Sequence, residues 1–143
     1  MTAQFVRKLF GWPMTLAIFF ALQALLLGGT FGGRLEGWLY PVVSATHITQ
    51  TEPVDEYSTR IWGEANKIRD CAFVSISWYI GTPESHALVA MNIEERSNLR
   101  PAENFSFGPW VVKLTPDELR DHSFAKTLHQ CHPFWLTESR FYP

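Results

Sequence analysis

The sequence has little charge and few cysteines, and it lacks the short motifs of common catalytic sites. Only 18% of its 143 residues are charged, whereas 46% are hydrophobic and 15% aromatic. No G-x-S-x-G, P-loop, C-x-x-C or H-x-x-x-H occurs, so there is no nucleophile elbow, phosphate cradle or standard zinc spacing. We therefore expect a protein that is not an enzyme and that uses neither a cofactor nor a metal. The sequence identifies no small-molecule substrate.

Basic residues are also scarce in most of the chain. After Glu36, nine Lys or Arg residues face thirteen Asp or Glu residues. A dedicated nucleic-acid binder normally carries a basic patch. This balance predicts a mildly acidic domain that does not bind nucleic acid.

Charge is absent altogether from one long segment. The 25 residues Leu9–Gly33 contain no charged side chain. Within it, Pro13–Phe31 would measure about 28 Å as a helix, close to the ~30 Å hydrocarbon core of a bilayer. An uncleaved transmembrane helix over residues 13–33 is therefore expected. The alternative is a signal peptide with Met14–Leu27 as its apolar region, but "GGTFGG" contains no A-x-A cleavage site.

The flanks of this span predict its orientation. Arg7 and Lys8 precede it, and a mostly acidic stretch follows it, so the positive-inside rule places the N-terminus in the cytoplasm. In a bacterium the rest of the chain would then be periplasmic, on an inner-membrane anchor. The expected membrane-interface anchors are Arg7, Lys8, Trp12, Trp38 and Tyr40.

The two cysteines, Cys71 and Cys131, both lie in this exported part. An even number of cysteines in an oxidising compartment favours one disulfide, which matters for a domain of this size. Closing a 60-residue loop would contribute about 4 kcal/mol in the chain-entropy model.

The stretch "LHQCH" around Cys131 allows two other interpretations. A c-type haem site would need a cysteine where Leu128 stands. A zinc site would need His122, His129 and His132 on one helix face, and Pro133 disfavours helix there. The disulfide is the interpretation that needs only the two cysteines to meet.

The exported part predicts a small β-rich, sandwich-like domain of α+β class. Cys71–Ile80 and His86–Glu95 are expected to form a hairpin, with further strands at Trp110–Leu114 and within "FWLTESRFY". The sequence "TPDEL" from Thr115 is a capping box, so one short helix should begin there and end before Pro133. The expected divisions are a cytoplasmic tail (1–12), the transmembrane helix (13–33), an interfacial segment and linker (34–58) and the periplasmic domain (59–143).

Small residues recur along one side of the span, at intervals of four, three, four and four. Such stripes let helices approach closely in lipid, and a mid-membrane amide normally seeks a partner. The expected packing residues are Ala17, Ala21, Ala24, Gly28, Gly32 and, on another side, Gln23.

These features favour an accessory or structural subunit of an inner-membrane complex, respiratory or photosynthetic for example, whose partners are the membrane and other transmembrane subunits. The alternative is a free-standing, membrane-tethered periplasmic binding module. The ending "CHPFWLTESRFYP" resembles small, uncharacterised membrane-anchored proteins of proteobacteria and their prophages; the resemblance implies a bacterial or prophage source and says nothing about activity. The candidates for docking a partner are Phe134, Trp135, Phe141 and Tyr142.

Overall fold

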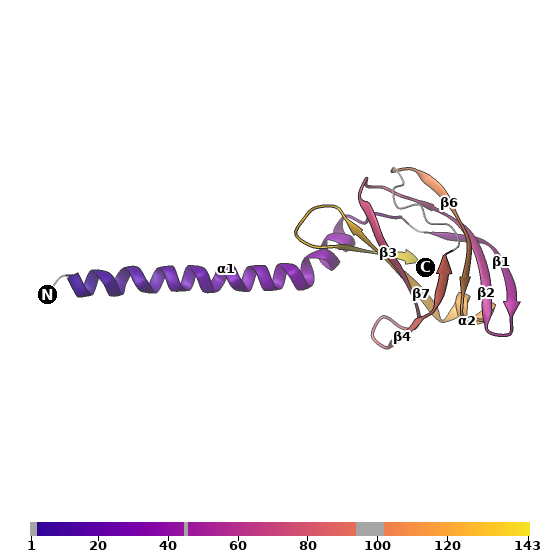
Figure 1. The fold of residues 1–143 in the computed structure, drawn as a ribbon, viewed down its shortest axis with the longest axis horizontal. Helices are drawn as coiled ribbons and strands as arrows, with labels where there is room; N and C mark the ends of the chain where they lie inside the picture. Colours follow the sequence, from indigo (N-terminus) through magenta and orange to yellow (C-terminus); the bar gives the residue numbers. More distant parts are fainter. Residues whose placement is uncertain (1–2, 45, 94–101) are drawn as a thin grey trace.

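A computed structural model describes residues 3–44, 46–93 and 102–143. It consists of a long N-terminal helix, α1 (Ala3–Leu39), joined to a β domain (Figure 1). The segment Trp12–Gly29 of α1 is long and apolar enough to cross a membrane, with a mean hydropathy of 1.6, and none of it is buried. The other elements are β1 (His47–Asp55), β2 (Ser58–Asn66), β3 (Ala72–Gly81), β4 (His86–Val89), β5 (Met91–Ile93), β6 (Asn104–Val112), α2 (Pro116–Asp121), β7 (Ser123–Gln130) and β8 (Thr137–Tyr142).

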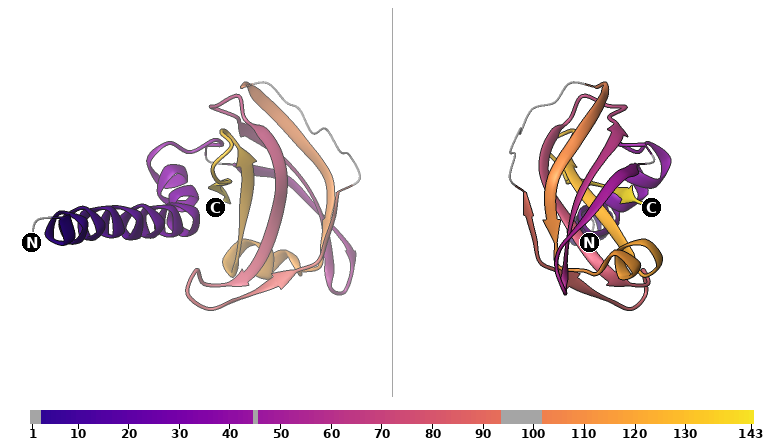
Figure 2. Two further views of the ribbon diagram at one scale, coloured as in Figure 1. Left: turned by 60° about the vertical axis from the view of Figure 1, so that its left-hand side comes forward. Right: turned by 90° about the vertical axis from the view of Figure 1, so that its right-hand side faces the viewer.

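The β domain is built from two antiparallel four-stranded sheets with the orders β1-β2-β6-β5 and β4-β3-β7-β8. The two sheets face each other (Figure 2), and residues from both form one apolar core. Phe107 from the first sheet meets Phe141 from the second with ring centroids 5.2 Å apart, and Trp78 is fully buried. The α+β class with a mostly antiparallel β domain is therefore confirmed.

The expected helix at "TPDEL" is present but much shorter than its upper limit at Pro133. Thr115 caps α2, and the capping box with Glu118 is formed. The helix ends at Asp121, and β7 follows where helix was still allowed. In β7 the first three residues, Ser123–Ala125, are buried, and beyond them Thr127 and His129 are buried while their neighbours are not. Pairing with both β3 and β8 satisfies the backbone of this segment, and such tertiary pairing outweighs local helix propensity.

Other expected strands are present with altered limits. β3 and β4 form the predicted hairpin, but the chain leaves this sheet after Val89, and β5 joins the other sheet. β6 spans Asn104–Val112 and so begins well before the strand expected at Trp110–Leu114, and β8 is the predicted last strand. A register shift between Phe73 and Ser75 in β3 changes which residues of that strand face the core.

The segment expected as interface and linker, residues 34–58, has regular structure at both ends. α1 continues to Leu39, and β1 occupies His47–Asp55 as an edge strand beside β2. Its many polar residues suit an edge strand with exposed side chains, which is why it resembles a connector in sequence. The last turns of α1 bend away from the axis of the apolar part and lie against the β domain (Figures 1 and 2).

Candidate functional site at the helix–sheet junction

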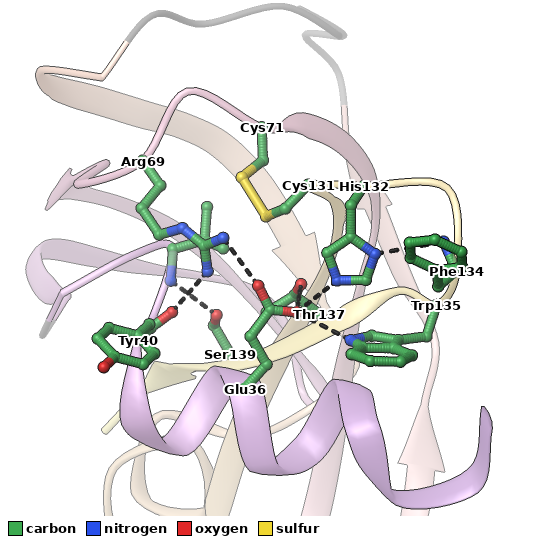
Figure 3. Close-up of polar contacts among 11 residues, drawn as sticks. Glu36, Tyr40, Arg69, Cys71, Cys131, His132, Phe134, Trp135, Thr137 and Ser139 are labelled. Carbon is green, nitrogen blue, oxygen red and sulfur yellow. Dashed lines mark hydrogen bonds and ion pairs between the residues drawn. A yellow bond between two sulfur atoms is a disulfide. The ribbon is translucent and has the colours of Figure 1, made fainter. Parts of the chain in front are cut away.

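A cluster of polar side chains lies where α1 meets the domain, around the carboxylate of Glu36 (Figure 3). One oxygen, Oε1, accepts a hydrogen bond from Arg69 Nη2 at 2.8 Å. The other, Oε2, accepts from His132 Nε2 and Trp135 Nε1, both at 2.9 Å, and from Thr137 Oγ1 at 2.8 Å. These five residues are called the Glu36 cluster below. They join α1, the segment before β3, and the β7–β8 arm, which runs from Cys131 to Thr137 at the start of β8.

The environment of Glu36 keeps it ionised. Burial by itself would raise the pKa of the carboxyl group, but the hydrogen bonds from Arg69, Trp135, Thr137 and His132 outweigh burial and lower the pKa to about 2. A carboxylate with this pKa and four donors around it has little capacity to accept a proton near neutral pH. The geometry suits a structural role, in which Glu36 holds α1 against the β domain.

His132 is oriented on both sides of its ring. Its Nδ1 accepts a hydrogen bond from the backbone N–H of Phe134 at 3.2 Å, while Nε2 donates to Glu36. This pattern assigns the ring proton to Nε2. The ring of Trp135 stands edge-on to the imidazole at a centroid distance of 4.6 Å. The tip of the β7–β8 arm is thereby folded against α1.

Glycines on α1 allow the β8 backbone to approach the helix. A Cβ at Gly33 would collide with the carbonyl oxygen of Leu136, and one at Gly37 with that of Glu138. A Cβ at Gly32 would lie 2.8 Å from the Trp135 ring. Any larger residue at these positions would push α1 away from β8. The two glycines Gly33 and Gly37 are thus required by backbone-to-backbone contact.

The disulfide joins the two segments that supply donors to Glu36. Cys71 and Cys131 are bonded, as the sequence predicts. Arg69 lies two residues before Cys71, and His132 directly follows Cys131. The bond therefore holds both donor segments at the end of α1.

The end of α1 is closed by further hydrogen bonds from the domain. Arg69 Nη1 donates to the carbonyl oxygen of Tyr40 at 2.9 Å, which satisfies an acceptor that the helix leaves free. The N–H of Val42 donates to Ser139 Oγ at 3.0 Å, and the carbonyl of Val42 accepts from the N–H of Ile68 at 2.8 Å. The segment that leads from α1 into the sandwich is therefore hydrogen-bonded through both the N–H and the carbonyl group of Val42.

The three histidines considered for zinc lie in different places. His122 follows α2 on the surface, His129 is buried in β7, and His132 binds Glu36. Among the described residues, no three His, Cys, Asp or Glu side chains gather as a possible metal site.

His129 lies in a partly unsatisfied polar environment. It is 3% exposed, and its Nδ1 has no hydrogen-bond partner within the described residues. Burial, followed by the positive charge of Lys67, lowers the pKa of His129 to about 4. The side chain is therefore neutral inside the domain at neutral pH.

The predicted packing stripe divides into two parts. Ala17, Ala21 and Ala24 lie on the exposed apolar part of α1, as does Gln23. Gly28 and Gly32 instead face Trp135 of the same chain. The C-terminal end of the stripe, Gly28 and Gly32, thus packs against the protein's own domain.

The predicted docking and anchor residues also separate. Phe134 is 78% exposed and Trp135 is half-buried against α1, whereas Phe141 belongs to the core and Tyr142 packs beside Trp78. Of the anchors, Trp12, Trp38 and Tyr40 are exposed, and the side chains of Arg7 and Lys8 lie outside the described part of the structure.

Sequence reasoning missed the role of Glu36, Arg69 and Thr137. Glu36 served there only to mark where the acidic excess begins, although it is the first acidic residue of the chain and comes shortly after the uncharged apolar segment. That position is the one available signal; its partners are 33 to 101 residues away. Comparisons with family models, curated proteins and solved structures found no match to this chain.

Proposed function

We propose that this protein is a non-catalytic, single-span subunit of a bacterial inner-membrane complex. Its N-terminus would be cytoplasmic, and its sandwich would stand in the periplasm. The apolar helix Trp12–Gly29, the positively charged residues before it and the disulfide support this placement.

The observation that carries the proposal is the Glu36 cluster. The domain follows the span without a flexible linker, because Glu36 is bound by donors from two separate segments of the domain. Such a junction holds one face of the domain in a constant orientation relative to the membrane. A subunit that must match a neighbouring protein needs this constancy, whereas a tethered binding module can function without it.

The exposed N-terminal part of the stripe of small residues supports the same proposal. Ala17, Ala21 and Ala24 leave a shallow surface on α1 that none of the described residues covers. In lipid, small residues let a neighbouring helix approach closely.

The test is purification from native membranes in a mild detergent. We expect partners at fixed stoichiometry. Ala21→Leu should weaken their recovery by filling the stripe, while Phe19→Trp, a bulky change on the opposite side of the helix, should not. A wild-type chain that purifies as a monomer with nothing bound would contradict the subunit role and favour the tethered module.

A further inference from the structure

We propose that the β7–β8 loop, residues 131–136, is a second membrane contact that places Phe134 in the lipid interface. This inference rests on the membrane anchoring proposed above. It assigns Phe134 to a contact with lipid, whereas the sequence made Phe134 a candidate for docking a protein partner.

The position of Trp135 sets the depth of the loop. Its ring lies over Gly28 and Gly32, with Cζ3 3.7 Å from where a Cβ of Gly28 would be. Gly28 belongs to the apolar segment Trp12–Gly29. That segment measures about 27 Å as a helix, slightly less than the ~30 Å hydrocarbon core. The ring therefore stands at the boundary between hydrocarbon and headgroups.

The orientation of the indole matches this boundary. Its polar Nε1 points along α1 toward Glu36, to which it donates, and its apolar edge points toward Gly28 (Figure 3). Glu36 lies eight residues after Gly28, about 12 Å farther from the span along the helix. Tryptophans at membrane interfaces have their apolar edge on the lipid side and their N–H on the wet side.

The neighbouring surface is apolar and open. Phe134 is 78% exposed and Leu136 38% exposed. On the helical turns beside the loop, Leu27, Phe31 and Leu35 are 56%, 59% and 57% exposed. The loop itself contains no Lys, Arg, Asp or Glu. This surface continues directly from the span, so the bilayer that covers the span would cover it too.

The bend of α1 extends the same surface. Trp38, Leu39 and Tyr40, at the end of the helix, are 78%, 53% and 68% exposed. The last turns of α1 bend away from the axis of the apolar segment (Figures 1 and 2), so the end of the helix need not lie as far from the membrane as a straight helix would place it. Together with Phe134, these three side chains would form a mainly aromatic surface on which the domain contacts the membrane interface.

Site-specific photo-crosslinking of the full chain in native membranes tests this. The photo-reactive amino acid p-benzoylphenylalanine would replace Phe134, Phe20 or Tyr57, one at a time. The three aromatic residues are similarly exposed, at 78%, 65% and 67%. Phe20 lies inside the span, and Tyr57 lies in the β1–β2 turn at the opposite end of the sandwich (Figure 1).

Mass spectrometry of the irradiated chain should find phospholipid adducts at positions 134 and 20 in comparable yield, and none at position 57. Adducts at 20 without adducts at 134 would overturn the loop contact and leave the membrane anchor intact. A protein adduct at 134 in place of lipid would overturn it in favour of a docked partner. Absence of lipid adducts at 20 would instead contradict the proposed membrane span.

Discussion

Trp135 Nε1 donates a hydrogen bond to Glu36 Oε2 at 2.9 Å, although the two residues are 99 positions apart. The bond joins the end of the apolar helix to the arm that leads into the last strand. With the donors Arg69, His132 and Thr137, it makes the helix part of the folded domain.

Glu36→Gln should destabilise the domain by about 2 kcal/mol or more, because hydrogen bonds to a charged acceptor are worth more than neutral ones. The Gln amide also presents donors where Arg69 or the other donors need acceptors. Thermal unfolding followed by near-ultraviolet circular dichroism, in detergent, measures the change. Glu52→Gln is the matched control: that exposed carboxylate pairs with Arg60 at 3.2 Å, and the loss of this pair should cost less than about 1 kcal/mol. Equal effects would contradict a special role for Glu36.

The same carboxylate should produce an acid-sensitive step. The pKa of Glu36 is lowered from 4.5 to about 2, so its contribution to stability is full above pH 4.5 and is lost as the pH falls toward 2. We expect this step to amount to about 2 kcal/mol, less than the full shift implies because solvent screens part of the group. Unfolding free energies measured between pH 5 and 2 should show the step in the wild type and not in Glu36→Gln.

His129 should produce a second step at higher pH. The pKa of this buried imidazole is lowered from 6.5 to about 4, so the fold favours the neutral ring. Stability is therefore full above pH 6.5 and falls as the pH drops from 6.5 to 4, by about 2–3 kcal/mol. His129→Leu should flatten the stability curve over this range. His122→Leu, a change at an exposed histidine, should keep the wild-type slope; a flat slope in that variant would assign the step elsewhere.

Gly33→Ala should separate α1 from β8, because a Cβ there collides with the Leu136 carbonyl oxygen. Overpacking of this kind costs typically about 1–3 kcal/mol. Gly29→Ala provides the control: nothing lies within 4 Å of its Cβ position, and alanine favours helix by up to about 1 kcal/mol. Protease protection of the helix–domain junction should fall only in Gly33→Ala. Protection that is equal in both variants would show that the contact is dispensable.

Replacing both cysteines with serine should cost about 4 kcal/mol by releasing a 60-residue loop. It should also loosen the hold on α1, because Arg69 and His132 lie next to the two half-cystines in sequence. Unfolding of the variant and of the wild type, with and without reductant, measures both effects. Free thiols in the native, unreduced wild type would contradict the bond itself.

Features that depend on neighbouring residues could be predicted from sequence. A run without charge predicts an apolar helix, "TPDEL" predicts a helix start, and alternating apolar residues around Trp78 predict a strand. The cysteine pair follows from their number, since two cysteines allow one pairing. In each case the determining information lies within one short window or in a simple count.

Features that depend on distant residues could not. β7 is a strand because β3 and β8 pair with it from both sides, and β1 is a strand because it pairs with the edge of β2. Neither fact is visible in the local pattern, which for "SFAKTLHQ" also suits a helix.

The sequence by itself determined the apolar helix, the class of the domain and the partner of each cysteine. The tertiary structure alone decided that Glu36 is the point where helix and domain join. It also decided that Gly28 and Gly32 face Trp135 and that Phe141 lies in the core while Phe134 does not. The physical reason is that a carboxylate gains donors, and a glycine gains a neighbour, only when chain folding brings together segments about a hundred residues apart.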